Sequence, residues 1–237
     1  MQQVLITGAS SDIGIATSKK YLAKGFHVVG HYHRGQDSFF KLVDSSPKMK
    51  AIQIDLSNPM ANEKKFAQYE DLIDKTDVLI NMAAISPPKP FNNISAIDIV
   101  EVLNINLIAA LLLIRTVTPG MIQRKWGRIV NIGSIGVKFG GGSNSFCYSL
   151  SKHSLEFFPA DHKKWAADNV FINTIRVGVT DTKSHQRDPE KNMELRVQRI
   201  PAKRMASPDE ISDIIYWLGS GQNTFTTGQV IAASGGE

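Results

Sequence analysis

The sequence predicts a doubly wound α/β fold, in which helices cover both faces of a seven-stranded parallel sheet, within a single domain spanning 1–237. Seven short runs of apolar, often β-branched residues recur along the chain, and segments long enough for crossover helices separate them. The runs are almost continuously apolar, which is typical of parallel strands buried on both faces. A glycine-rich turn also follows the first run, where folds of this kind hold a phosphate.

The expected strands are VLIT at 4–7, HVVGHY at 27–32, AIQI at 51–54, VLIN at 78–81, RIVNI at 128–132, FINTI at 171–175 and QVIAA at 229–233. Helices are expected at 13–24, 95–123, 148–168 and 208–219. Pro159 falls inside the third helix and removes a backbone donor, so we expect a kink there. In such sheets a ligand lies beyond the carboxyl ends of the strands. Residues that directly follow strands are therefore the candidate functional residues.

Composition limits the class of protein. With 42% hydrophobic residues in a chain of 237, a full core can be buried. The sequence contains no uninterrupted run of about 18 apolar residues that would predict a membrane span. The chain also starts in a strand-like run without a charged leader. We therefore expect a cytoplasmic protein without a membrane partner. Cys147 is the only cysteine, which rules out an intrachain disulfide and a cysteine-rich metal site.

The net charge of +5 is spread through helix-like segments instead of being gathered in an arm or stripe. The spread favours anionic small molecules or an acidic partner over nucleic acid. His31 and His33 lie two residues apart, but no nearby carboxylate or cysteine completes a ligand set. We therefore expect no metal site, with the two histidines beside a cofactor or in solvent.

The turn ITGASSDIG at 6–14 brings backbone amides to a helix N-terminus, where they favour a phosphate. Gly8 permits a tight bend, and Gly14 permits close packing of the helix on the strand. Asp12 stands where a dinucleotide fingerprint has its middle glycine. We expect its carboxylate to face solvent or to cap the helix that begins at Ile13. The glycine spacing alone also describes an ordinary turn between a strand and a helix.

A second candidate site comes from YSLSK, which puts Tyr148 and Lys152 four residues apart on one face of a helix. A free tyrosine has a pKa near 10, and a neighbouring lysine would stabilise tyrosinate and so make Tyr148 a usable acid and base. Ser134 follows a predicted strand and would add a donor for developing negative charge. Taken singly, a solvent-exposed tyrosine–lysine pair and a loop serine explain the same residues.

Together these motifs resemble the short-chain dehydrogenase/reductase family over essentially the whole chain. The matching segments, in order, are Gly8 to Gly14, NMAA at 81–84, NINL at 104–107, Ser134, YSLSK at 148–152 and the ending TTGQVIAASGG. GRIVNIGS and SPDEISDIIYWLGS most resemble its 3-oxoacyl-[acyl-carrier-protein] reductase branch and related carbonyl reductases. The resemblance implies a Rossmann-like oxidoreductase in which Tyr148 exchanges the proton and Lys152 also bonds the nicotinamide ribose. It implies that Ser134 bonds the substrate oxygen and that Asn106 helps to place a water of a proton relay.

The resemblance also implies a nicotinamide cofactor. Its expected contacts are Gly8, Ser10, Ser11, Asp12, Ile13, Gly14, His33, Arg34, Asp55, Leu56, Asn81, Ala83, Tyr148, Lys152, Gly178, Thr180 and Thr182. An enzyme that uses NAD usually carries an acid after the second strand, but this chain has Tyr32 there, followed by His33 and Arg34. A cation near the ribose favours a 2′-phosphate, so we expect NADPH in preference to NADH.

The substrate is less determined. A variable lid is expected around 183–204, and its charged residues are Lys183, Arg187, Lys191, Arg196, Arg199, Lys203 and Arg204 against Asp188, Glu190 and Glu194. Arg124, Lys125 and Arg128 form a second basic cluster near where carrier-protein reductases receive their partner. Both clusters suit a 3-oxoacyl thioester on acyl carrier protein or CoA, although solvated helix faces explain them equally.

Two alternatives stay open. One is a reductase of a pteridine, sugar or secondary-metabolite ketone, and the other is a non-catalytic NADP-binding sensor. The resemblance implies a homotetramer, whereas Pro159 makes a dimer plausible. Val177 and Ser234 stand where the family has a proline and an aspartate.

Overall fold

A computed structural model describes residues 2–183 and 192–237. Seven parallel strands form one sheet in the order β3-β2-β1-β4-β5-β6-β7. They are β1 (Gln3–Ile6), β2 (His27–Tyr32), β3 (Met49–Gln53), β4 (Val78–Asn81), β5 (Gly127–Ser134), β6 (Val170–Val177) and β7 (Gln229–Ala233). The doubly wound fold and its seven strands are confirmed. Strand order reverses between β1 and β4, and the crevice at such a switch point is where a ligand binds.

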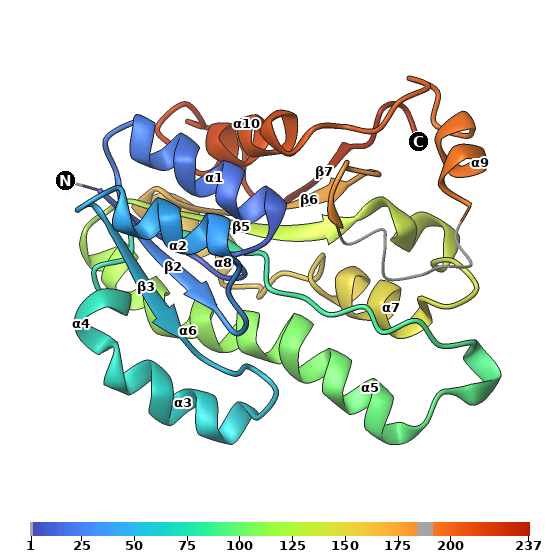
Figure 1. Cartoon of the computed structure of the whole chain (residues 1–237). Coiled ribbons are helices and arrows are strands. Elements are labelled where there is room, and N and C mark those ends of the chain that lie inside the picture. The colour runs from blue at the N-terminus through green and yellow to red at the C-terminus, as the bar shows by residue number, and fades with distance from the viewer. Residues whose placement is uncertain (1, 184–191) are drawn as a thin grey trace.

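Helices cover both faces of the sheet (Figure 1). They are α1 (Asp12–Ala23), α2 (Asp37–Asp44), α3 (Pro59–Gln68), α4 (Glu70–Ile73), α5 (Ala96–Leu103), α6 (Ala109–Gln123), α7 (Phe146–Ser154), α8 (His162–Trp165), α9 (Met193–Gln198) and α10 (Pro208–Leu218). Short helical turns are η1 (Phe91–Asn93), η2 (Asn104–Ile108), η3 (Ile135–Phe139) and η4 (Ala166–Asp168). Two cores result, because successive strand side chains face opposite ways: Val4 and Ile6 pack with α1 and α10, and Leu5 packs with α6.

Residues 96–123 form one continuous helical segment through α5, η2 and α6. By length and composition it could cross a membrane: an 18-residue stretch of it has a mean hydropathy of 2.2, and 33% of that stretch is buried in the fold. In this fold its second half lies against the sheet, where Leu113, Val117 and Met121 are buried in the core. The core accounts for this buried part, whereas Ile97 and Val100 of α5 remain exposed.

The helix predicted over 148–168 is wrong in its second half. α7 ends at Ser154, and helical structure returns only at α8. Pro159 lies in this break, so it helps to end the helix instead of kinking a continuous one. Phe157, also in the break, is 86% exposed.

The end of α7 is fastened to the sheet. The Leu155 carbonyl, which would have continued the helix, accepts hydrogen bonds from Asn131 of β5 at 3.3 Å and Thr174 of β6 at 2.9 Å. Glu156 then forms a two-point ion pair with Arg176, at 2.7 and 2.6 Å. Side chains of the sheet thus satisfy the Leu155 carbonyl, which has no partner in a longer helix.

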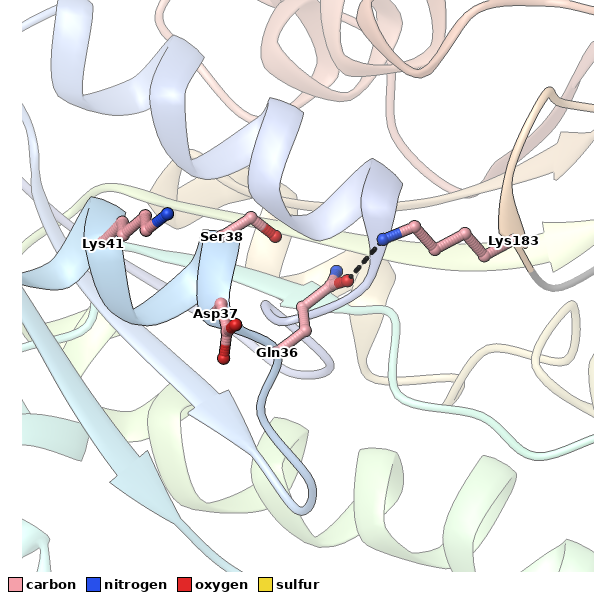
Figure 2. A pocket seen from close by; sticks show the side chains of 5 residues that line it. All are labelled: Gln36, Asp37, Ser38, Lys41 and Lys183. Atoms are coloured by element: carbon pink, nitrogen blue, oxygen red, sulfur yellow. Dashed lines mark hydrogen bonds between the residues drawn. The ribbon is translucent and has the colours of Figure 1, made fainter.

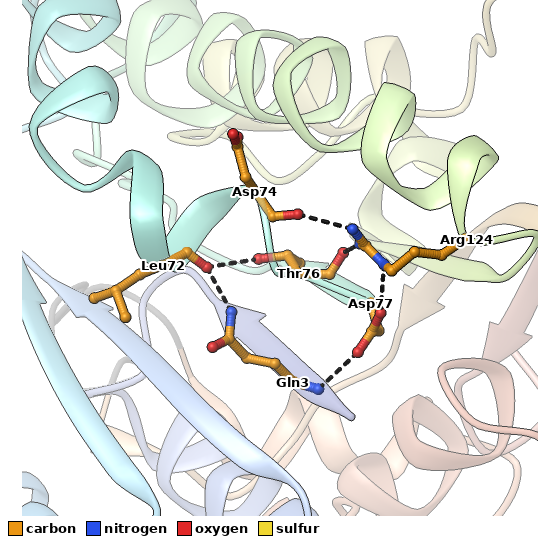
Figure 3. A network of polar contacts seen from close by, with 6 residues as sticks. All are labelled: Gln3, Leu72, Asp74, Thr76, Asp77 and Arg124. Atoms are coloured by element: carbon orange, nitrogen blue, oxygen red, sulfur yellow. Dashed lines mark hydrogen bonds and ion pairs between the residues drawn. The ribbon is translucent and has the colours of Figure 1, made fainter. Parts of the chain in front are cut away.

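The predicted basic cluster of Arg124, Lys125 and Arg128 is wrong. Figure 3 shows Arg124 reaching three groups: its guanidinium bonds the Asp77 carboxylate at 2.9 Å and the carbonyls of Asp74 and Thr76 at 3.0 and 2.7 Å. The Gln3 amide bonds the other Asp77 oxygen at 3.0 Å. The contacts of Arg124 and Asp77 thus hold β1, β4 and the end of α6 together.

The other two residues of this cluster are equally occupied. Lys125 pairs with Asp168. Arg128 is 2% exposed, and its guanidinium carbon lies 4.8 Å from the centre of the Trp126 ring and 4.1 Å from that of Phe171. All three cations lie at the amino ends of the strands, whereas Ser134 lies at the carboxyl end of β5. The three residues are therefore not a group of unpaired cations beside Ser134.

Candidate active site

The proposed proton-transfer residues come together at the carboxyl end of β5. Ser134 ends that strand, and its side chain lies close enough to Tyr148 in α7 to act on the pKa of the tyrosine. The Ser134 oxygen also accepts the Gly136 amide at 3.1 Å, which fixes the side chain. Burial raises the pKa of Tyr148, and the Ser134 side chain works against that rise. The tyrosine is therefore protonated at neutral pH and able to donate a proton.

Lys152 lies one turn further along α7 and is 2% exposed. Its ammonium donates to the Ile132 carbonyl at 2.6 Å and lies 5.8 Å from the centre of the Tyr148 ring. Burial lowers the pKa of Lys152 to about 8. The sequence suggested that this lysine lowers the pKa of Tyr148. In the structure, burial dominates that pKa and the opposing effect comes from Ser134.

Asn106 lies in η2, a π-helical turn between α5 and α6, and is 1% exposed. Its amide exchanges two hydrogen bonds with the Ile85 backbone, at 2.8 and 2.9 Å, and donates a third to the Ser151 hydroxyl at 2.9 Å. Ser151 in turn donates to the Tyr148 carbonyl at 2.7 Å. Asn106 thus ties the segment after β4 to the helix of the tyrosine, and π-helical turns occur often at functional sites.

Sequence reasoning missed Ser151. Its position within YSLSK, three residues after Tyr148, places it on the tyrosine's side of the helix and could have signalled this link.

The glycine turn leaves no room for side chains at its two glycines. Gly8 has φ +70°, and a Cβ there would lie 3.0 Å from the Ala83 backbone. A Cβ on Gly14 would lie 2.4 Å from the Gly8 carbonyl. Ser11 caps α1 by accepting the Gly14 amide at 3.1 Å, so the predicted cap at Asp12 is wrong.

The turn keeps free donors for a phosphate. Within residues 2–183 and 192–237, no acceptor meets the amides of Asp12 and Ile13, which lead α1. The Asp12 carboxylate accepts the Lys183 amide at 2.8 Å, so it neither caps the helix nor stands free in solvent. Free amides at a helix N-terminus and a turn without Cβ atoms fit the diphosphate of a dinucleotide.

His31 holds the glycine turn in place through a hydrogen bond to Gly8. It is 4% exposed; its Nε2 donates to the Ile54 carbonyl at 2.9 Å, and its Nδ1 accepts the Gly8 amide at 3.2 Å. These two bonds together require the neutral ring, and burial lowers the pKa of His31 to about 4. Burial excludes the solvent position expected as one alternative for His31, while its bond to Gly8 places it directly behind the turn proposed to hold the cofactor.

The residues expected around the adenosine divide into two groups. His33 and Asp55 are half-exposed and 4.0 Å apart, and the Asp55 carboxylate accepts the Ser57 amide at 2.9 Å, which lowers its pKa. The Arg34 carbonyl accepts the Ser10 hydroxyl at 3.1 Å, and its side chain is exposed. Leu56, by contrast, packs in the core between sheet and helices, so its side chain does not line the crevice.

Asn81 ends β4 and donates to Asn131 at 2.9 Å, while its own Oδ1 is buried and has no partner in the described part of the chain. The neighbouring Ala83 amide bonds the Thr7 hydroxyl at 3.0 Å. Thr7, which sequence reasoning missed, thereby joins the ends of β1 and β4 at the switch point. A buried acceptor without a partner costs free energy, which a bound nucleotide or water would relieve.

Gly178, Thr180 and Thr182 follow β6. A Cβ on Gly178 would lie 2.6 Å from the Cα of Ser234. Val177 and Ser234, the two positions that differ from the family pattern, therefore lie at this contact between the ends of β6 and β7. The Thr180 hydroxyl donates to the Gly178 carbonyl at 3.2 Å. Thr182 is partly buried beside Lys183.

The predicted lid is described at 183 and 192–204, while Arg187, Asp188, Glu190 and Lys191 lie outside the described residues. Two of its cations are already paired: Arg196 with Glu237 at 2.6 Å and Arg204 with Glu210 at 2.7 Å. The described part of the lid thus has fewer unpaired cations than its sequence suggests.

Known proteins share this architecture over nearly the full chain. Residues 8–237 match the family described as enoyl-(acyl carrier protein) reductase. A 3-oxoacyl-[acyl-carrier-protein] reductase of Aquifex aeolicus is 31% identical, over 98% of this chain and 95% of the relative. An acetoacetyl-CoA reductase of Shinella zoogloeoides is 33% identical, over 98% and 97%. The crystal structure of a 3-oxoacyl-(acyl-carrier-protein) reductase of Agrobacterium tumefaciens with NADP bound has a TM-score of 0.87 at 26% identity, over 100% and 94%.

Proposed function

The chain belongs to the short-chain dehydrogenase/reductase family and is a carbonyl reductase, and we propose that it reduces a 3-oxoacyl thioester with NADPH by proton transfer from Tyr148. The observation that carries the proposal is that Ser134 and Tyr148 lie close together at the carboxyl end of β5, with Lys152 buried one turn further along α7. A non-catalytic nucleotide sensor would need neither this pair nor the buried lysine.

The residues that would hold NADPH are the amides of Asp12 and Ile13, the side chains after β2 and β3, Asn81, and the segment after β6. NADPH, when bound there, supplies a hydride for the carbonyl carbon. Ser134 and Tyr148 hold the carbonyl oxygen between two hydroxyls, which stabilise the negative charge that develops on it. Tyr148 then donates its proton to that oxygen, and its raised pKa keeps the proton in place until then.

Lys152 and Asn106 act on the same proton. The buried ammonium stabilises the tyrosinate that the transfer leaves behind, because opposite charges interact strongly away from water. Asn106 holds α7 in position through Ser151, and we assign it the water of the proton relay in addition. The side chain of Asn106 already makes three hydrogen bonds, to Ile85 and Ser151, so we assign the water to its backbone carbonyl.

The thioester is supported by the names of the two sequence relatives, one acting on a carrier-bound and one on a CoA-bound 3-oxoacyl group. Acetoacetyl-CoA is therefore the first substrate to test, with the loss of NADPH absorbance as the signal. We expect turnover that Tyr148→Phe removes and that NADH supports poorly. Tight NADPH binding without turnover of any thioester or simple ketone would contradict the proposed thioester substrate and would favour the non-catalytic sensor.

We also propose a homo-oligomer, supported by apolar side chains that the fold leaves on the surface of α5 and in the break after α7. Ile97, Val100 and Phe157 are among them. Light scattering on the purified protein distinguishes tetramer, dimer and monomer.

A further inference from the structure

A cavity of about 520 Å³ opens between the start of α2 and the segment after β6 (Figure 2). Its lining residues are Gln36, Asp37, Ser38, Lys41 and Lys183. Two of the five are lysines, and they come from segments about 140 residues apart in the chain, since Lys41 belongs to α2 and Lys183 follows β6. The fold thus brings two cations to one opening beside the glycine turn.

Lys183 is held at both ends. Its amide donates to the Asp12 carboxylate at 2.8 Å, and its ammonium donates to the side-chain oxygen of Gln36 at 3.1 Å. Gln36 in turn donates its amide to the Ser10 carbonyl. The ammonium is therefore fixed beside the glycine turn by a neutral acceptor. An ammonium has three donors, and within residues 2–183 and 192–237 only Gln36 takes one from Lys183, which leaves two for a ligand.

The position of the cavity identifies the ligand. It lies next to the end of β2, where the adenosine ribose of a dinucleotide is bound in this architecture. An enzyme that uses NAD places a carboxylate there for the ribose hydroxyls, and β2 ends instead in Tyr32. The Arg34 side chain is exposed and does not line the cavity.

We propose that Lys183 binds the 2′-phosphate of NADPH and thereby sets the preference for NADPH over NADH. The inference rests on the proposed use of NADPH and moves the cationic contact from Arg34 to the lysine after β6. Asp37 also lines the cavity, and its negative charge offsets the positive charge of the lysines there. Removing that carboxylate should therefore strengthen phosphate binding.

The test is calorimetric titration of the protein with NADP⁺ and, separately, NAD⁺, which differ only in the 2′-phosphate. Lys183→Gln should weaken NADP⁺ binding by roughly tenfold or more, as expected for one charge-assisted hydrogen bond to phosphate, and leave NAD⁺ binding unchanged. Lys183→Arg should restore most of the affinity for NADP⁺. Asp37→Asn should tighten NADP⁺ binding alone. Lys24→Gln, at the far end of α1, removes the same charge and serves as the matched control.

Two outcomes overturn the inference. Equal losses for NADP⁺ and NAD⁺ in Lys183→Gln would mean that the lysine acts on the shared diphosphate. An unchanged ratio in Lys183→Gln together with a lost preference in Arg34→Gln would return the contact to Arg34. If the wild-type protein binds neither dinucleotide, it is the proposed function that fails, and the two failures are thus distinguishable.

Discussion

Asp12 and Lys183 lie 171 residues apart and are joined by a 2.8 Å hydrogen bond from the Lys183 amide to the Asp12 carboxylate. A carboxylate inside a phosphate-binding turn would by itself repel the phosphate. Here it has a second use, because it fixes the backbone of a residue whose ammonium stands beside the same turn. A dinucleotide fingerprint has glycine at the position of Asp12. Compared with that glycine, Asp12 adds a negative charge to the turn and also adds the hydrogen bond to Lys183.

Asp12 variants separate these two effects. Asp12→Ala removes the acceptor of the Lys183 amide, and we expect it to weaken NADP⁺ binding by roughly fivefold, since one such bond contributes about 1 kcal/mol. Asp12→Asn keeps an acceptor and removes the charge, so NADP⁺ binding should be equal to wild type or tighter. Calorimetric titration measures both. If Asp12→Ala binds more tightly than Asp12→Asn, the carboxylate does nothing but repel phosphate.

Tyr148→Phe removes the proton donor and keeps the ring. General acid catalysis contributes about 10²- to 10⁴-fold, so kcat for acetoacetyl-CoA reduction should fall by that amount. The dissociation constant of NADPH, followed by fluorescence, should change by no more than about threefold, because the hydroxyl faces the substrate oxygen. A variant with near wild-type kcat would transfer the role of acid to another group.

The buried Lys152 predicts an alkaline limit on activity. Burial lowers its pKa to about 8, so the ammonium is present below that pH and is lost as the pH rises through it. We expect kcat/KM for reduction to be level below about pH 8 and to fall above it, because the neutral amine no longer stabilises tyrosinate. Lys152→Arg keeps the charge at all these pH values, and any activity it retains should lack the decline. Identical pH profiles for the two proteins would assign the limit to another residue.

His31 predicts an acid limit on stability. Its pKa is lowered from 6.5 to about 4 in the fold, so the unfolded chain takes up the proton first. The contribution of the neutral ring is complete above pH 6.5 and is lost as the pH falls toward 4, by about 3 kcal/mol in all. Urea unfolding of wild type and His31→Asn at pH 7 and pH 4.5 measures it. The variant should lose less stability between the two pH values, and equal losses would remove His31 as the cause.

The strands were predictable from sequence because each is a short apolar run flanked by polar residues, and burial on both faces makes such runs distinct. Tyr148 and Lys152 were predictable because helical periodicity alone puts them on one face. The cap of α1 was not, because Ser11 and Asp12 both offer a suitable oxygen, and the extended backbone of Ser11 decides between them. The contact between Asp12 and Lys183 has no local signal in the sequence.

Two errors have identifiable physical causes. Arg124 and its neighbours precede β5, so they had to lie at the amino edge of the sheet, and their carboxylate partners come from distant segments. The helix after Tyr148 was extended through Pro159 because apolar residues continue at helical spacing. The competing partners of its last turn, Asn131 and Thr174, belong to the sheet.

The fastening of Leu155 to β5 and β6 also divides the chain into parts that can open separately. With α7 held by the sheet, we expect residues 157–168 to open more readily than α7, even though Phe158 and Trp165 pack on the core. Amide hydrogen exchange should therefore be fast in that segment while the amides of α7 stay protected. The position of Tyr148 would then not depend on the conformation of residues 157–168. The surface that these residues form could vary in sequence, or adapt to a neighbouring molecule, without disturbing the reaction centre.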